Sequence, residues 1–216
     1  MSIVPIKTPA LVKKMLPNYV WDIPTTNKEL YLTFDDGPTP EITNWTLDIL
    51  DQYNAKATFF CIGANAERYP SIFNRILNKQ HTIGNHTQNH VKGWSTTTQN
   101  YLNNVKKADT TINRLLANQN RSKVSLFRPP YGQIKPQQSR KIRALGYNII
   151  MWDVLSFDWE RNISEKECLE HIISNSGPGS IIVFHDSVKA SKNMKYALPK
   201  VLAFFSNKGF VFKSLS

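Results

Sequence analysis

Short apolar runs alternate along the chain with longer segments whose apolar residues recur at helical spacing. The strand-like runs lie at 30–34, 57–62, 82–85, 124–128, 147–152, 180–184 and 210–213. Helical periodicity covers 10–16, 40–53, 67–80, 98–116, 136–145, 164–175 and 196–207. Near-continuous apolar strands separated by amphipathic helices are typical of parallel sheets with both faces covered. The pattern therefore predicts an α/β fold with about seven parallel strands.

Polar side chains gather where these predicted strands end. In chain order they are Asp35, Asp36, His86, His90, Arg128, Tyr131, Asp158 and His185. In a barrel of parallel strands the carboxyl ends form the active-site face. An open doubly wound sheet also binds ligands there, but the chain has no Gly-x-Gly-x-x-Gly or phosphate loop. We therefore expect a distorted (β/α) barrel with its active site at the carboxyl ends of the strands.

Two adjacent acids, Asp35 and Asp36, follow the first strand and precede a Gly-Pro turn. Burying two carboxylates side by side is costly unless a cation binds them, although Asp-Asp-Gly-Pro alone also fits an ordinary turn. His86 and His90 are four residues apart and would share one face if their segment were helical. Two imidazoles and one carboxylate, with open positions, suit a tetrahedral zinc ion that also binds water.

The segment Arg128-Pro-Pro-Tyr-Gly132 supplies a second kind of chemistry. The proline after Arg128 favours an extended backbone, from which the guanidinium can clamp a carboxylate. Pro129 and Pro130 have no N–H, so the next backbone donor is that of Tyr131, placed to bind an oxyanion. Alone, the segment fits a proline-rich turn equally well.

His185 ends an apolar strand, a place where a histidine is often a core residue. Asp158 is available to orient it and to raise its pKa, as a general acid requires. Asp186 follows directly and is a candidate cap for the next helix.

Composition narrows the class of protein. The 216 residues carry a formal net charge of +11, but the basic residues are scattered and form no zinc-finger, basic-helix or RNP-like pattern. We therefore expect a diffuse basic surface and no nucleic-acid site. No run of eighteen apolar residues exists, so no membrane span is predicted. Cys61 and Cys168 are predicted to be free buried thiols.

Residues 1–29, which contain four prolines, are predicted to be a lead-in to a motif-bearing core at 30–216. Together they would form one monomeric domain. The first residues lack the basic and apolar regions of a signal peptide, which favours the cytoplasm or a signal that was removed or is not recognisable.

Taken together, Thr33-Phe-Asp-Asp-Gly-Pro38, His86-Thr-x-x-His90, Arg128-Pro-Pro-Tyr-Gly132, Asp158-Trp159 and Val183-x-His185 resemble the five ordered motifs of the polysaccharide deacetylases. This is the NodB-homology domain of carbohydrate esterase family 4. The resemblance implies a distorted (β/α) barrel, which agrees with the strand pattern. The last motif usually has Leu where this chain has Val183, and Leu155 stands where many members have an aspartate.

The resemblance also implies roles for the site residues. Asp36, His86 and His90 correspond to the metal ligands; the metal is usually zinc, with Co²⁺, Ni²⁺ or Mn²⁺ as alternatives. Asp35 corresponds to the catalytic base, Arg128 to the arginine that positions it, and His185 to the general acid that Asp158 tunes. Tyr131 is assigned to the oxyanion, and substrate contacts fall to Pro130, Trp159 and Val183.

The expected reaction is hydrolysis of the N-acetyl group of a GlcNAc-containing glycan, of peptidoglycan or chitin type, to a free amine and acetate. The partner would be an acetylated amino-sugar polymer or oligosaccharide, which for most of the family lies outside the cell. Three alternatives stay open: an O-acetyl esterase acting on a polysaccharide such as xylan, a two-His-one-carboxylate iron oxygenase, and a catalytically silent glycan-binding module.

Overall fold

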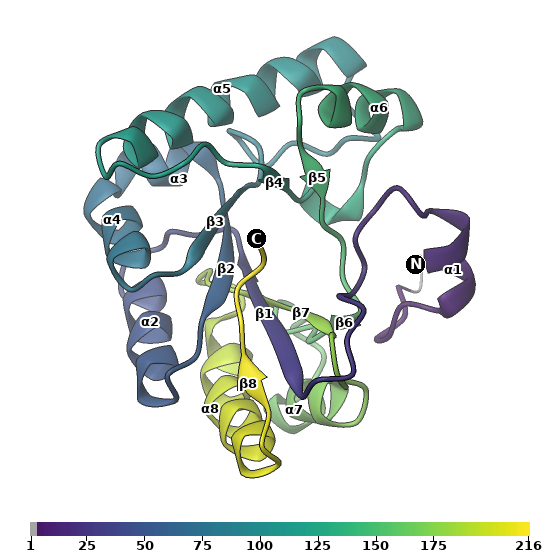
Figure 1. The fold of residues 1–216 in the computed structure, drawn as a ribbon, viewed down its shortest axis with the longest axis vertical. Coiled ribbons are helices and arrows are strands. Elements are labelled where there is room, and N and C mark those ends of the chain that lie inside the picture. The colour runs from purple at the N-terminus through teal and green to yellow at the C-terminus, as the bar shows by residue number, and fades with distance from the viewer. Residues whose placement is uncertain (1–3) are drawn as a thin grey trace.

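A curled parallel sheet forms the centre of the structure, a computed structural model that describes residues 4–216 (Figure 1). Its strands are β1 Glu29–Asp35, β2 Ala57–Cys61, β3 Thr82–Asn85, β4 Leu126–Phe127, β5 Asn148–Ile149, β6 Val154–Leu155, β7 Ile181–His185 and β8 Val211–Phe212. Seven follow the order β5-β4-β3-β2-β1-β7-β6, and β8 pairs with the start of β1. All pairings between these strands are parallel, so the predicted distorted barrel is confirmed.

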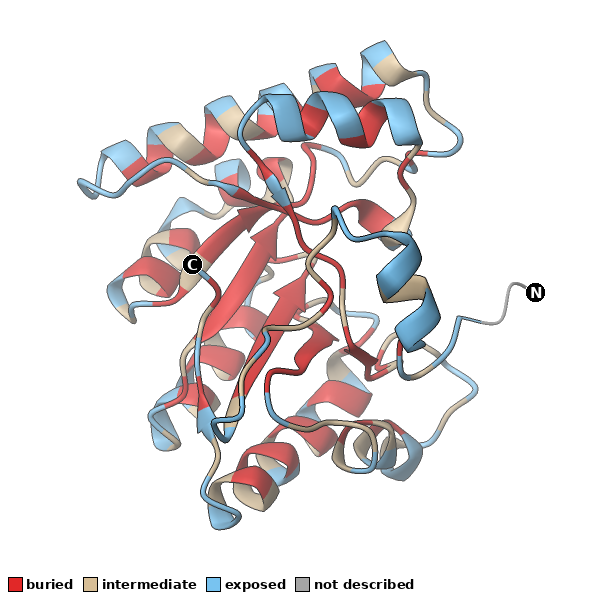
Figure 2. Ribbon diagram, turned by 45° about the vertical axis from the view of Figure 1, so that its right-hand side comes forward, coloured by how far each residue is buried: buried red, intermediate tan, exposed pale blue. Residues whose placement is uncertain are grey.

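Helices surround the outside of this sheet (Figure 1). They are α1 Ala10–Met15, α2 Ile42–Gln52, α3 Gly63–Arg68, α4 Pro70–Asn78, α5 Thr98–Ala117, α6 Pro136–Ala144, α7 Glu165–Ile173 and α8 Ser191–Asn207, with a short 3-10 turn at Pro130–Gly132. Helix α1 is different, because none of its residues is buried (Figure 2). No helix within residues 4–216 has both the length and the apolarity to cross a bilayer.

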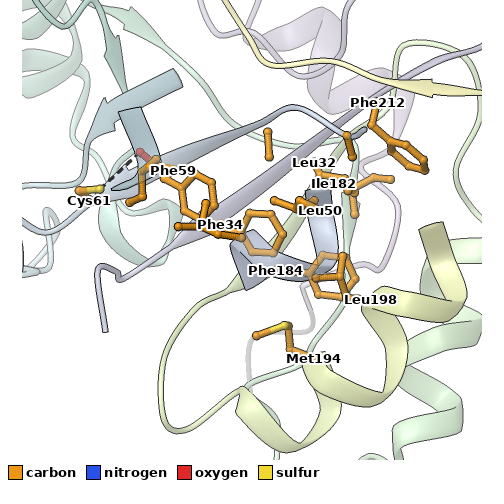
Figure 3. Packing of buried hydrophobic residues seen from close by; sticks show 14 of the residues in the cluster. Leu32, Phe34, Leu50, Phe59, Cys61, Ile182, Phe184, Met194, Leu198 and Phe212 are labelled. Carbon is orange, nitrogen blue, oxygen red and sulfur yellow. Dashed lines mark hydrogen bonds between the residues drawn. The ribbon is translucent and has the colours of Figure 1, made fainter. Parts of the chain in front are cut away.

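Strand β1 shows how the sequence pattern separates two cores. Leu32 and Phe34 belong to the outer cluster between sheet and helices, where Phe34 stacks on Phe59 and Phe184 at ring-centroid distances of 5.0 and 6.0 Å (Figure 3). Tyr31 belongs to a smaller second cluster with residues of β2, β4 and β7. Because alternate strand residues point to opposite faces, Asp35 shares the face of Tyr31, inside the curl of the sheet.

The lead-in segment lies along the side of the sheet where the path from β5 to β6 is open. Val20 forms a parallel bridge with Ile150, and Lys7 forms an antiparallel bridge with Val154. Asp153, nearly buried, accepts bonds from Lys13 Nζ at 2.6 Å and from Ser180 Oγ at 2.6 Å. Lys7 Nζ lies 3.5 Å from the same carboxylate, so two lead-in lysines are paired with one sheet-edge acid. The first three residues of the predicted lead-in lie outside the described residues.

Several predicted element boundaries were wrong. The helix predicted at 67–80 is two helices, α3 and α4, because Pro70 lacks an N–H and starts a new helix. Helix α8 begins at Ser191, five residues earlier than predicted. The predicted strands at 124–128 and 147–152 contribute only two residues each as β4 and β5, and the short strand β6 was not predicted. Cys61 and Cys168 are free and buried, as predicted.

Candidate active site

The turn after β1 gives the two adjacent acids different surroundings. Asp35, the last residue of β1, accepts a bond from Arg128 Nη1 at 2.8 Å. Regular pleating would send Asp36 to the opposite face. Instead Asp36 has a φ of 78°, a left-handed value that few non-glycine residues adopt, and its carboxylate lies beside two histidines. The backbone dihedral of Asp36 itself therefore brings both acids to one site.

Arg128 is fully buried, and its guanidinium binds residues of the site. Nη1 donates to Asp35 at 2.8 Å and to Thr33 Oγ1 at 2.6 Å, while Nη2 donates to the Met151 carbonyl at 2.7 Å. The guanidinium carbon lies 4.2 Å from the centroid of the Phe60 ring. Burial lowers the pKa of Arg128, and the neighbouring Asp35 opposes that shift. Arg128 thus fixes the orientation of the Asp35 carboxylate.

The segment that carries His86 and His90 is not helical, so the two side chains do not share a helix face. The two rings still converge, with centroids 5.1 Å apart, because Thr87 and His90 both have left-handed φ values of 64° and 53°. Asn85 accepts the Thr87 N–H at 2.8 Å. Asn104 on α5 accepts the next two backbone N–H groups at 2.9 and 3.0 Å. Side-chain amides therefore hold the turn.

Asp36, His86 and His90 form a group that could hold a metal ion, with one ligand atom from each lying within 4.8 Å of the others. Asp36 Oδ1 is 3.6 Å from His86 Nε2 and 3.0 Å from His90 Nε2. It is buried and has no hydrogen-bond partner among residues 4–216. His86 Nδ1 lies 2.8 Å from the Arg128 carbonyl, an arrangement in which Nδ1–H donates and Nε2, on the side of Asp36, would be free to bind a metal ion. This donor set fits a metal ion.

The charges of Asp36 and His86 also suit metal binding. Burial alone would raise the pKa of Asp36, but the neighbouring histidines, His90 foremost, hold it well below its usual range. Burial lowers the pKa of His86 to about 4, although Asp35 opposes this. At neutral pH the site therefore offers an ionised carboxylate and a neutral imidazole at His86, which are the protonation states that metal binding requires.

His185 faces this group from the end of β7, whose register pairs it with Asp35. Asp158 binds it twice: one oxygen is 2.8 Å from His185 Nδ1 and the other accepts the His185 N–H at 2.7 Å. Burial lowers the pKa of His185, but the carboxylates of Asp158, foremost, and of Asp36 and Asp35 outweigh burial and raise that pKa to about 9. The imidazole is therefore protonated at neutral pH. Trp159 packs edge-on against it, with ring centroids 4.7 Å apart.

The remaining predicted residues line the edge of the site. Tyr131 has a left-handed φ of 61° and is 56% exposed as a residue. The centroid of its ring lies 4.6 Å from that of the His90 ring. Pro130 is buried just before it. Val183 is buried on β7, two residues before His185 and opposite Leu155 of β6. The structure thus gathers the predicted side chains around one end of the sheet.

Sequence reasoning missed the supporting residues. Asp186 does not cap the following helix: its carboxylate accepts a bond from Thr43 Oγ1 on α2 and packs against Gly37. A Cβ on Gly37 would lie 2.0 Å from Asp186 Oδ2. Burial raises the pKa of Asp186 to about 7. Two features of the sequence could have pointed to this contact: the acid Asp186 directly after His185, and the glycine directly after Asp36.

Comparison with known proteins shows the family of this chain. The family model for polysaccharide deacetylase matches residues 22–150. A peptidoglycan-N-acetylglucosamine deacetylase of Bacillus cereus is 36% identical over 198 residues, which cover 91% of this chain and 70% of that protein. The chain belongs to the polysaccharide deacetylase family.

Other members of the family resemble it as well. A chitooligosaccharide deacetylase of Azorhizobium caulinodans is 34% identical over 164 residues, 76% of each protein. The crystal structure of the Bc1960 peptidoglycan N-acetylglucosamine deacetylase superposes with a TM-score of 0.85 at 36% identity, covering 92% of this chain and 91% of that one. The polysaccharide deacetylase fold therefore extends over nearly the whole chain, beyond the residues of the family model.

Proposed function

We propose that this polysaccharide deacetylase is a metal-dependent hydrolase that removes N-acetyl groups from a GlcNAc-containing glycan, giving a free amine and acetate. The observation that carries the proposal is the separation of the two adjacent acids. Asp35 is bonded to Arg128, whereas the buried Oδ1 of Asp36 has no hydrogen-bond partner among residues 4–216 and lies beside His86 and His90. The relatives named above, which act on peptidoglycan and chitooligosaccharide, support this substrate class.

Asp36, His86 and His90 would hold the metal ion, and two nitrogens with one carboxylate favour Zn²⁺. When bound, the ion supplies Lewis-acid polarisation of the acetyl carbonyl and lowers the pKa of a water. Asp35, oriented by Arg128, takes a proton from the water that attacks the carbonyl carbon. The backbone N–H of Tyr131 is assigned to the oxyanion that develops.

Proton delivery falls to His185. Since Asp158 raises its pKa to about 9, His185 is protonated before the reaction and can donate to the amine nitrogen as the C–N bond breaks. The amine leaves with that proton, and acetate is the second product. Trp159 and Val183, beside His185, are the proposed walls for the acetyl methyl group.

Acetate release from three substrates tests the proposal: a chitin tetrasaccharide, purified peptidoglycan strands and acetylated xylan. We expect metal-loaded protein to deacetylate at least one N-acetyl substrate, to lose that activity after chelation and to recover it with Zn²⁺. Acetate from xylan alone would favour O-acetyl ester hydrolysis instead. No acetate from any of the three by metal-loaded protein would overturn the proposal.

A further inference from the structure

Lys92 places an unpaired positive charge at the edge of the proposed site. Its Nζ lies 5.1 Å from the centroid of the Tyr131 ring, and that ring lies 4.6 Å from the ring of His90. Lys92 is exposed and takes part in none of the ion pairs formed by residues 4–216. A cation is therefore held one aromatic ring away from a proposed metal ligand, with no carboxylate of the protein bound to it.

The backbone around Lys92 is fixed by contacts with the segment that follows Tyr131. Gly93 packs so closely that a Cβ there would lie 2.1 Å from the Gln133 carbonyl oxygen. Gln138 on α6 donates to the Gly93 carbonyl at 2.9 Å. These contacts fix the backbone next to Lys92 against the segment that follows Tyr131, so the base of the Lys92 side chain has a defined place beside the Tyr131 ring.

Charge on the substrate decides whether such a cation is useful. A chain built only of GlcNAc is neutral and offers Lys92 nothing to pair with. In peptidoglycan strands each GlcNAc is flanked by a muramyl sugar, whose lactyl group carries a carboxylate or a peptide. Other lysines contribute to the net charge of +11, but a general positive field attracts any anion. Lys92 differs in lying beside Tyr131, at the edge of the proposed site.

We propose that Lys92 is a specificity-determining residue that pairs with the lactyl carboxylate of the muramyl sugar next to the acetylated residue. The site would then prefer an acidic, muramyl-containing strand to a neutral one of the same length. This inference rests on the proposed N-deacetylase function. It predicts that the higher rate on the acidic strand depends on two charges, that of the Lys92 ammonium and that of the lactyl carboxylate.

The test is a two-by-two comparison of charge on the enzyme and on the substrate. Wild-type and Lys92→Met proteins, both metal-loaded, are assayed for acetate release from a GlcNAc–MurNAc tetrasaccharide and from its lactyl methyl ester. A chitin tetrasaccharide serves as the neutral reference. Lys200→Met is the matched control, because Lys200 on α8 also lies over a tyrosine ring, at 3.6 Å from the centroid of Tyr196.

We expect Lys92→Met to lower kcat/KM for the free acid about fivefold, the size of an exposed ion pair, with little change for the ester or for chitin. Esterification should cost the wild-type protein the same factor, and added salt should reduce it. Lys92→Arg should retain the preference, and Lys200→Met should match wild type. Equal losses on acid and ester, or no loss on either, would overturn the inference while leaving the deacetylase function intact. Failure of wild type on every substrate would instead overturn both.

Discussion

At the scale of single residues, the site depends on one unusual backbone dihedral. The φ of 78° at Asp36 turns a carboxylate that would face the helices toward His86 and His90. Asp35, one residue earlier, keeps its place on the inner face and stays bonded to Arg128. Substitution of these two neighbouring acids should therefore have two different effects: loss of turnover at Asp35 and loss of the metal ion at Asp36.

Asp35→Asn should abolish turnover without removing the metal. The amide can still accept the Arg128 bond, so the fold is kept, but it cannot take a proton from water. We expect kcat to fall by at least about a hundredfold, a typical contribution of general-base catalysis. Acetate release gives the rate, and elemental analysis of the dialysed protein gives the metal content. An active Asp35→Asn protein would remove this residue as the base.

Asp36→Ala should lose the metal ion and the activity together. It deletes one of three proposed ligands, and the two remaining imidazoles would bind the ion far more weakly. Metal content after dialysis should drop together with activity, whereas Asp35→Asn should retain the ion under the same treatment. One ion per chain in Asp36→Ala would contradict the ligand assignment.

The protonation of His185 predicts the alkaline side of the pH profile. Its pKa of about 9 lies above the ordinary histidine value, so the imidazole carries its proton below that pH and loses it above. kcat/KM should therefore fall as the pH rises through about 9. Asp158→Asn removes the charge that raises this pKa, so the fall should move to lower pH. A pH profile of kcat/KM for both proteins measures this, and an unmoved alkaline limb would contradict it.

At the scale of elements, the sequence predicted the long strands and helices well, because their burial follows a simple period. Strand β3 was predicted with its observed bounds, and α5 within one residue. The turn at 86–90 was harder, since its geometry depends on Asn85 and on Asn104 from α5, eighteen residues after His86. Periodicity carries no information about such bonds. The convergence of the two histidines was therefore predictable from the sequence, but the local structure that joins them was not.

The turn between β1 and α2 can be tested through Gly37. Gly37→Ala would place a methyl group against the buried Asp186 carboxylate, 2.0 Å from Oδ2 without rearrangement. We expect the free energy of unfolding to fall by about 1–3 kcal/mol, as for other overpacked sites, and metal affinity to weaken because Asp36 is the preceding residue. Urea unfolding and metal titration measure the two effects. Gly177→Ala is the control, since a Cβ there meets nothing within 4 Å; equal stability of the two variants would contradict the crowding argument.

At the scale of the whole molecule, the sheet does not close on itself through its own strands. The lead-in covers the open side, where Val20 bridges Ile150 and Lys7 bridges Val154. This explains why β5 is shorter than the predicted strand at 147–152: Met151 donates its N–H to the Val20 carbonyl instead. The sequence of the lead-in could not predict this pairing. Its four prolines interrupt any strand pattern, and the paired residues are more than a hundred positions apart in the chain.

Asp153→Asn tests how much this covering segment contributes to stability. The substitution keeps the shape of a nearly buried side chain but removes the charge that binds Lys13 and Lys7. We expect the free energy of unfolding to fall by about 1–3 kcal/mol, the range for hydrogen bonds to charged groups. Hydrogen exchange should also rise in the segment around Lys13, which the ion pairs hold against the sheet.

The matched control is Asp51→Asn, which removes the more exposed pair with Lys79. Exposed pairs contribute little to stability, so its urea midpoint should stay close to that of wild type. If Asp153→Asn has the same midpoint and exchange pattern as this control, the ion pairs do not hold the lead-in. Its apolar contacts and the backbone bridges at Val20 and Lys7 would then account for the closed side of the barrel.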